Sequence, residues 1–209
     1  MANFVNRTKL VVTKTNTIEN KFRNLDLEII AGDPNLGFEV IVKENGVNFK
    51  LDFSKVYWNP RLSTEHERIV DLVQKGDVVF DVFAGIGPFA IPIAKKGQIT
   101  KKSPKGILVH ANDLNPSSFQ YLKENIGLNK IKSDLMHCYN LDGGEFIKTI
   151  IGPKLVEYYQ ENNEVIHVLF CFNFSLFVLY FVLFVLCCIF CLFLFCFTFC
   201  FDLCNLNSF

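Results

Sequence analysis

Residues 77–89 read DVVFDVFAGIGPF, an apolar run that ends in two closely spaced glycines. A continuous apolar run of this length is typical of a strand that is covered on both faces of a parallel sheet. Gly85 and Gly87 follow where this strand gives way to a helix predicted over 87–97. Glycines at such a point let the backbone approach a ligand closely. In open parallel sheets, ligands bind beyond the carboxyl ends of the strands.

Helix and strand patterns alternate around this stretch. LSTEHERIVDLVQKGD (62–77) predicts a helix with Ser63 or Thr64 as its N-cap and Gly76 at its end. The elements predicted after the glycines are a strand over 107–113, a helix over 116–130 and, over 135–147, a third strand that runs into a turn. This alternation predicts an α/β fold, a Rossmann-like doubly wound sheet that is incomplete in this chain.

The N-terminal part predicts short strands separated by turns. LEIIAG (27–32) and FEVIVKENGVNFKLDF (38–53) are rich in apolar and β-branched residues, and Asn45-Gly46 predicts a tight hairpin turn. The segment MANFVNRTKLVVTKTNT (1–17) contains Arg and Lys without an acid, which also fits an organellar presequence, although its Val and Thr residues favour a strand. We therefore expect a β-rich module over 1–56, a partial Rossmann-like domain over 57–168 and an apolar tail over 169–209.

The tail differs in composition from the rest of the chain. Residues 165–209 hold one charged residue, Asp202, together with 13 of the 23 Phe and seven of the eight Cys. The uncharged run over 165–201 is long enough for a transmembrane helix. Its Phe and Cys bias and its lack of flanking Lys and Arg favour translated non-coding sequence instead. No His or acid accompanies the clustered cysteines, so no metal site is expected.

The glycine stretch matches neither a dinucleotide fingerprint nor a P-loop, because G-x-G-x-x-G is absent and no Lys-Ser/Thr follows. The remaining arrangement is one used for S-adenosylmethionine, with a D-x-F-x-G-x-G loop under the methionine end and an acid at the tip of the second strand. Asp113, in ANDLNP (111–116), could accept hydrogen bonds from both ribose hydroxyls. Asp142, before Gly143-Gly144, is placed to meet the adenine amino group.

Four segments in a fixed order carry a resemblance to one family: VYWNPRLSTEHERI, DVFAGIGPFAIPIAKKG, ANDLNPSSFQYLKENIGLNK and YNLDGGEFI. They resemble the tRNA (guanine-N1) methyltransferases that modify position 37, in their eukaryotic and archaeal form. The similarity covers about residues 9–168. It implies S-adenosylmethionine as methyl donor, N1 of guanine 37 as acceptor, the anticodon loop of tRNA as partner, and a monomer.

The resemblance also implies roles for individual residues. Glu65 matches the glutamate that takes the proton from N1 of guanine, and Arg61 matches the arginine that holds the guanine or a phosphate. Asn115 and Pro116 complete the family's D-x-N-P cofactor motif. The full set of implied cofactor-binding residues is Tyr57, Asp81, Phe83, Gly85, Gly87, Pro88, Asp113, Leu114, Asn115, Asp142 and Gly143.

Several residues have a purely structural interpretation as well. Glu65 could be a first-turn acid that favours the helix dipole, and Arg61 a surface cation. Tyr57 and Trp58 could stack on a base or pack at a domain junction, and His110 fits a core or edge position. The basic cluster that could meet the tRNA backbone, or form a solvated loop, consists of Lys95, Lys96, Lys101, Lys102 and Lys105.

The chain departs from the family pattern near residue 169, where FCFNFSLF (170–177) stands in place of an expected Asn-Leu-Pro motif. The family's N-terminal tRNA-recognition domain is not matched either. We therefore expect a form truncated at both ends that is weakly active or inactive. Two other functions remain open, a wybutosine-pathway aminocarboxypropyl transferase and a membrane-anchored, non-catalytic cofactor-binding protein. Cytoplasm, nucleus and mitochondrial matrix all fit as locations, with a membrane only if the tail is a real span.

Overall fold

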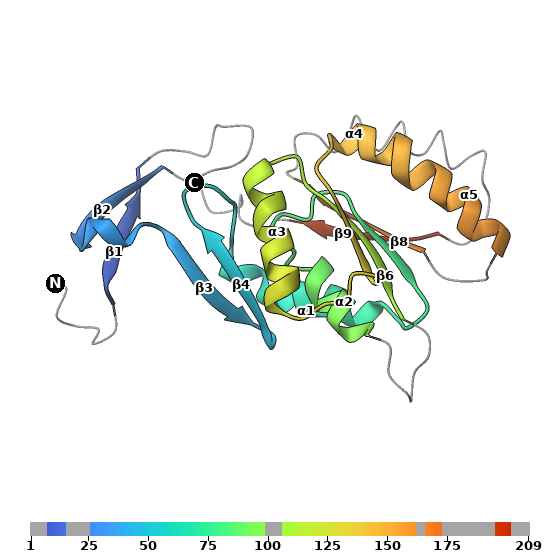
Figure 1. Cartoon of the computed structure of the whole chain (residues 1–209), viewed down its shortest axis with the longest axis horizontal. Coiled ribbons are helices and arrows are strands. Elements are labelled where there is room, and N and C mark those ends of the chain that lie inside the picture. The colour runs from blue at the N-terminus through green and yellow to red at the C-terminus, as the bar shows by residue number, and fades with distance from the viewer. Residues whose placement is uncertain (1–7, 16–25, 99–105, 162–165, 173–194, 202–209) are drawn as a thin grey trace.

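The computed structural model describes residues 8–15, 26–98, 106–161, 166–172 and 195–201. Two small antiparallel sheets precede a larger parallel one (Figure 1). The first pairs β1 (Leu10–Lys14) with β2 (Leu27–Gly32), and the second pairs β3 (Glu39–Glu44) with β4 (Val47–Asp52). A strand at β1 agrees with the strand interpretation of that segment, while residues 1–7 of the suggested presequence lie outside the described residues.

The third sheet is parallel throughout and has the strand order β7-β6-β5-β8-β9. Its strands are β7 (Met136–Tyr139), β6 (Leu108–Asn112), β5 (Val78–Asp81), β8 (Ile166–Phe172) and β9 (Phe195–Phe201). This topology confirms the predicted Rossmann-like doubly wound sheet. The chain order reverses beside β5, and such a switch point is where open α/β sheets bind their ligands.

Part of the apolar tail belongs to this sheet. β9 pairs with β8 in parallel, from Ile166 opposite Phe195 to Phe172 opposite Phe201. The positions where an Asn-Leu-Pro motif was expected, from residue 173 onward, lie outside the described residues, as do residues 187, 188, 191 and 204 among the tail cysteines. Among the helices of the described ranges, none has the length and apolar character needed to cross a membrane.

Helices cover both faces of the parallel sheet (Figure 1). The described helices are η2 (Pro34–Leu36), η3 (Pro60–Leu62), α1 (Ser63–Leu72), α2 (Ala90–Lys96), α3 (Pro116–Leu128), α4 (Gly143–Phe146), the π-helical η4 (Ile147–Ile151) and α5 (Gly152–Glu161). The expectation that Ser63 or Thr64 caps α1 is wrong. Asn59 caps the preceding turn η3 instead, its side chain accepting a hydrogen bond from the N–H of Arg61.

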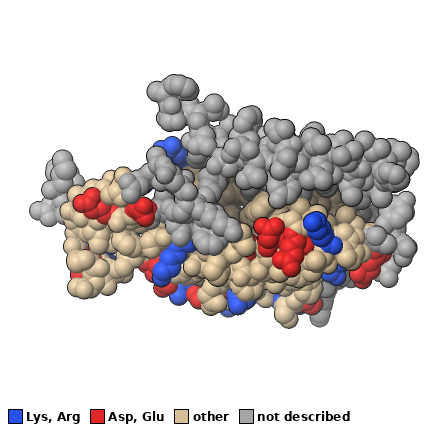
Figure 2. Space-filling view, turned by 90° about the horizontal axis from the view of Figure 1, so that it is seen from above, with Lys and Arg blue, Asp and Glu red and all other residues tan. Residues whose placement is uncertain are grey.

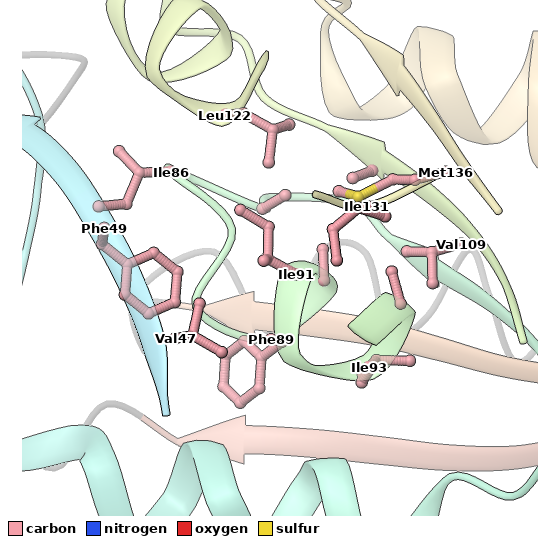
Figure 3. Packing of buried hydrophobic residues seen from close by; sticks show 14 of the residues in the cluster. Val47, Phe49, Ile86, Phe89, Ile91, Ile93, Val109, Leu122, Ile131 and Met136 are labelled. Carbon is pink, nitrogen blue, oxygen red and sulfur yellow. The ribbon is translucent and has the colours of Figure 1, made fainter. Parts of the chain in front are cut away.

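Two hydrophobic cores follow from the alternation of side chains along β5. Val78, Phe80 and Val82 face one core together with residues of α4, η4 and α5, whereas Val79 faces the other. Because successive side chains of a strand point to opposite faces, Asp81 lies on the same face as Val79. The second of these cores is formed with α1, α2, α3 and β4 (Figure 3).

The β3–β4 hairpin is built into that second core. Val47, Phe49 and Leu51 are buried there, and Phe49 lies near Ile86 of the glycine stretch (Figure 3). Asn45 and Gly46 have φ of 46° and 76°, the left-handed values that a tight two-residue hairpin turn requires. The predicted hairpin and its turn are confirmed.

Candidate functional site

The carboxyl ends of β5, β6 and β7 lie side by side, and one buried amide joins them. The side-chain nitrogen of Asn112 donates to the carbonyls of Val82 (3.1 Å) and Leu141 (3.0 Å), while its oxygen accepts from the N–H of Leu141 (2.9 Å). Asn112 is fully buried. Sequence analysis did not single it out, and the available signal was a polar residue at the end of an otherwise apolar strand.

Asp113 follows Asn112 and holds two neighbouring segments. One carboxylate oxygen accepts from the N–H of Gly85 at 2.8 Å, and the other accepts from the N–H of Asn115 at 2.9 Å. Burial raises the pKa of Asp113, and these two N–H donors counteract that rise. An ionised carboxylate offers about four acceptor sites, so each oxygen can accept a further hydrogen bond from a ligand hydroxyl.

Asp81, at the end of β5, is fully buried, and neither carboxylate oxygen has a hydrogen-bond partner among the described residues. The backbone N–H of Phe83 acts to lower the pKa of Asp81, but it is outweighed by two effects that raise it. Burial, and then the charge of Asp113, raise the pKa of Asp81 to about 7. A buried carboxylate without partners is costly, so a ligand that brings a positive charge or N–H donors would be favoured beside it.

The two glycines between these strands serve different purposes. Gly85 has a φ of 57°, and a Cβ built there would have no heavy atom within 4 Å. Gly87 has a φ of 96°, and its Cβ would lie 2.7 Å from Ile91 and 2.8 Å from Leu122. Gly85 therefore faces open space beside Asp113, whereas Gly87 lets the loop pack directly against α2 and α3.

Phe83 and Gly143 are brought together at the ends of β5 and β7. A Cβ on Gly143 would lie 2.8 Å from the ring of Phe83, so only glycine allows this close approach. Asp142 is exposed, and its carboxylate accepts from the N–H of Gly144 at 2.9 Å. It thus caps α4, just beyond the carboxyl end of β7.

The remaining residues of the D-x-N-P motif join the strand tips to the preceding segment. Asn115 caps α3, and its amide nitrogen donates to the carbonyl of Lys55 at 2.9 Å. Leu114 is partly exposed, and its carbonyl accepts from Asn140 at 3.1 Å. Pro88 is partly exposed between Gly87 and α2. We call the loop 82–89, together with the carboxyl ends of β5, β6 and β7, the cofactor side.

Tyr57 and Arg61 lie on the segment that leads into α1, called the acceptor side (57–68). Tyr57 is partly buried, and its hydroxyl accepts from the amide of Asn59 at 3.4 Å. Arg61 is exposed, and its backbone N–H donates to the side chain of Asn59, the residue that caps η3. Trp58 is buried against Phe49, with ring centroids 5.2 Å apart, so its packing interpretation is confirmed.

Glu65 forms a two-pronged ion pair with Arg68 on the next turn of α1. Both carboxylate–guanidinium distances are 2.7 Å. The side chains are 27% and 52% exposed. Exposed pairs of this spacing stabilise a helix by only about 0.3–0.5 kcal/mol. The carboxylate can therefore be released to a substrate at little cost.

His66, the next residue of α1, lies on the buried side of the helix. It is buried, its ring nitrogen lies 2.6 Å from Glu44 of β3, and its ring packs edge-on against Phe89 at 4.7 Å. This contact anchors the first turn of α1 to the hairpin and to the loop that follows β5. The buried side of the acceptor segment is thus held by β3 and by the loop after β5, whereas Arg61 is exposed and Glu65 partly exposed.

Two lysines of the proposed basic cluster donate hydrogen bonds to carbonyls of the protein itself. The ammonium of Lys95 donates to the carbonyl of Gly46 (2.7 Å), and that of Lys96 donates to the carbonyls of Val70 (2.8 Å) and Asp71 (3.3 Å). Lys96 thereby satisfies carbonyls at the C-terminal end of α1. Lys101, Lys102 and Lys105 lie outside the described residues. In Figure 2 the described Lys and Arg side chains lie among Asp and Glu side chains rather than in one field.

Two further titratable groups are unsuited to chemistry. His110 is buried between Phe80 and His137, and burial, with the nearby His137 and Lys154, lowers its pKa to about 3. Burial raises the pKa of the Cys138 thiol to about 11. His110 confirms the core interpretation. Within the described ranges no group of three or more His, Cys, Asp or Glu could hold a metal ion.

The sheet order, the glycine loop and the acid at the second strand tip define a Rossmann-like methyltransferase domain. The sequence profile of the TRM5/TYW2 methyltransferase domain matches residues 40–173. The chain belongs to this family.

Individual relatives agree with the profile. The chain is 49% identical over 163 residues to the tRNA (guanine(37)-N(1))-methyltransferase of Pediculus humanus subsp. corporis, covering 77% of this chain and 33% of that protein. The crystal structure of Trm5b from Pyrococcus abyssi matches with a TM-score of 0.59 and 34% identity, over 86% of this chain and 46% of that one. Trm5 of Methanocaldococcus jannaschii in complex with adenosine matches with a TM-score of 0.50 and 36% identity, over 59% of this chain and 35% of that one. The chain thus spans about a third of the length of its curated relative.

Proposed function

We propose that this chain carries the cofactor side and part of the acceptor side of an S-adenosylmethionine-dependent methyltransferase that acts on N1 of guanine 37 in tRNA. The proposal is carried by the buried carboxylate of Asp81, which has no hydrogen-bond partner within the described ranges and lies beside Asp113, itself hydrogen-bonded to Gly85. The family, and the name of the curated relative, support this reaction over other methyl transfers.

The cofactor side suits each part of S-adenosylmethionine. Asp81 would pair with the ammonium of its methionine end, and the unused lone pairs of Asp113 would accept the two ribose hydroxyls. Phe83, Leu114 and Asp142 would surround the adenine. When bound, the cofactor supplies a methyl group on a sulfonium. A related solved structure is a complex with adenosine, which supports a nucleoside as ligand of this domain.

On the acceptor side, Glu65 would take the proton from N1 of guanine, since that nitrogen is protonated in the neutral base. Arg61 would hold the base or a neighbouring phosphate, and Tyr57 would lie near the methionine end. For this, Arg68 must release Glu65, which the exposure of their ion pair permits. The weak or absent activity predicted for this chain remains a prediction.

Other assignments stay proposals too. An aminocarboxypropyl transferase of the wybutosine pathway uses the same cofactor, but the curated relative named above is a methyltransferase. The division at residue 56 is a prediction, and the burial of Val47, Phe49 and Leu51 in the common core supports counting β3 and β4 with the sheet. A monomer in the cytoplasm, nucleus or mitochondrial matrix is our proposal for the remaining properties.

Two measurements test the proposal. Isothermal titration of the 209-residue chain with S-adenosylmethionine should give one site, and absence of heat and of ligand-induced thermal stabilisation would refute the cofactor. Single-turnover methyl transfer, with the protein in excess, should label a tRNA transcript with G37 and not its A37 variant. Transfer of an aminocarboxypropyl group in place of methyl would favour the wybutosine-pathway function.

The role of Glu65 is tested separately. Glu65→Gln should lower the single-turnover rate by about 100-fold, because general-base catalysis contributes at least that much, while the affinity for S-adenosylmethionine stays unchanged. Glu67→Gln, on the same turn, is the matched control and should leave the rate unchanged. Equal rates for the two variants would remove Glu65 from the reaction.

A further inference from the structure

Two asparagine side chains, Asn125 of α3 and Asn129 at the C-cap of that helix, bond the backbone of β4. Asn129 accepts from the N–H of Asn48 (3.0 Å) and donates to its carbonyl (2.7 Å). One helical turn earlier, Asn125 accepts from the N–H of Lys50 (2.7 Å) and donates to its carbonyl (3.1 Å). In the hairpin, the backbone groups of Asn48 and Lys50 are those that point away from β3. The two amides therefore satisfy the free edge of β4.

Only one of these two amides also reaches the cofactor side. The side-chain nitrogen of Asn125 donates to the carbonyl of Ile86 at 3.3 Å, and Asn125 is fully buried. Ile86 lies between Gly85 and Gly87, both of which have positive φ. The same amide thus bonds the hairpin and the tightest part of the glycine loop.

The glycine loop is held at three consecutive residues. The N–H of Gly85 is bonded to Asp113, the carbonyl of Ile86 to Asn125, and the backbone of Gly87 packs against Leu122. Leu122 and Asn125 lie three residues apart on α3 and so share one face of that helix. Figure 3 shows Leu122 and Ile86 on the same side of the core. Without Asn125, the loop would keep its two ends but lose its middle support.

We propose that Asn125 is a positioning residue that couples the β3–β4 hairpin to the cofactor loop, so that displacement of the hairpin changes the affinity for the cofactor. The ligand in this inference rests on the proposed function. Asn129 supplies the internal comparison, because it bonds β4 in the same way without touching the loop.

The first test uses the ligand-free 209-residue chain and hydrogen exchange. Asn125→Ala and Asn129→Ala each remove two hydrogen bonds to β4, and both should speed exchange in residues 47–52. Only Asn125→Ala should also speed exchange of the Gly85 and Gly87 amides, by about ten-fold, the effect of one lost hydrogen bond. Equal exchange of the loop in the two variants would overturn the coupling.

The second test measures cofactor affinity by calorimetry with S-adenosylhomocysteine. Asn125→Ala should weaken binding by about ten-fold, and Asn129→Ala by less than about two-fold, although both lower the melting temperature. Unchanged affinity in Asn125→Ala would overturn the proposal. If the unsubstituted chain does not bind the ligand at all, the proposed function fails, and the exchange comparison still decides the coupling.

A measurement on the unsubstituted chain covers the case in which Asn125→Ala does not fold. In the unsubstituted chain, the amides of Lys50 and Gly87 should also open with the same free energy as denaturant is added. Separate opening of these two amides would contradict the coupling.

Discussion

On the cofactor side, Asp113 and Asn112 bind backbone groups inside the protein, whereas on the acceptor side Glu65 binds the half-exposed side chain of Arg68. The first set of contacts fixes the loop after β5 before any ligand arrives. The second set is an exposed ion pair that water and substrate can replace. The proposed nucleoside site is therefore preformed, whereas the proposed catalytic base must exchange its partner for the substrate.

This difference follows from what each side would bind. A small cofactor gains affinity from donors and acceptors that are already in place, because little ordering is left to be done on binding. A base presented by a large nucleic acid brings further contacts of its own, which can offset the loss of one surface ion pair. Substitutions on the two sides should accordingly differ in size.

The largest loss of stability is expected at the glycine packed into the core. Gly87→Ala should lower the free energy of unfolding by about 3 kcal/mol, because left-handed backbone costs about 1–2 kcal/mol and overpacking about 1–3 kcal/mol. Gly85→Ala has the first cost without the second and should lose about 1–2 kcal/mol. Urea denaturation of both variants checks this. Equal losses would show that the close contacts at Gly87 relax.

Asp113→Ala should weaken S-adenosylmethionine binding by about 100-fold, since hydrogen bonds to a charged group contribute about 1.5–3 kcal/mol each. It also removes the acceptors for the N–H groups of Gly85 and Asn115, so the loop should become less protected from exchange. Calorimetry measures the affinity, with Asp134→Ala, an exposed acid before β7, as control. A loss below about five-fold would place the ribose elsewhere.

Asp81 should make the stability of the ligand-free protein depend on pH. Its pKa rises from 3.8 to about 7 on folding, so the folded state binds the proton more tightly, and the ligand-free protein should lose stability as the pH rises from about 4 to about 7. Asp81→Asn should remove this loss and leave the variant more stable than the parent at pH 8, by about 1–2 kcal/mol if partial relaxation reduces the burial cost. Thermal melts between pH 4 and pH 8 test this.

The same substitution should weaken cofactor binding at pH 8, where the parent carboxylate is ionised and can pair with an ammonium. A variant that is more stable yet binds the cofactor as well as the parent would mean that Asp81 faces no ligand. Thermal stability and cofactor affinity, measured together, therefore show whether Asp81 is only a buried carboxylate or also binds the cofactor.

The smallest effect is expected on the acceptor side. Arg68→Ala should change the free energy of unfolding by less than about 0.5 kcal/mol, because exposed ion pairs contribute little. Cofactor affinity should not change. Denaturation in low and high salt checks this, and a loss above about 1 kcal/mol would show that the pair is part of the core structure and not a replaceable contact.

The parts of this molecule that sequence reasoning predicted are those with local causes. The turn at Asn45-Gly46 and the strand 78–81 follow from backbone preferences within a few residues. Asn112 and Asn125 were not found, because their partners are backbone groups 29 to 75 residues away and an asparagine in a strand or helix carries no local sign of them. Lys95 and Lys96 were expected to meet tRNA or solvent, and their carbonyl partners likewise come from distant elements.

The sequence alone determined the order of strands and helices from α1 to β7, the glycine-rich turn after β5 and the acid after β6, since each follows from the spacing of neighbouring residues. The tertiary structure alone decided which polar groups would lose water and what they would meet instead. Asp81 is buried and has no hydrogen-bond partner in the part of the chain that the structure describes, while Asp113, 32 residues later, is held by two N–H groups. That distinction arises because parallel strands bring remote segments to one edge, where burial and distance set the energy of each charge.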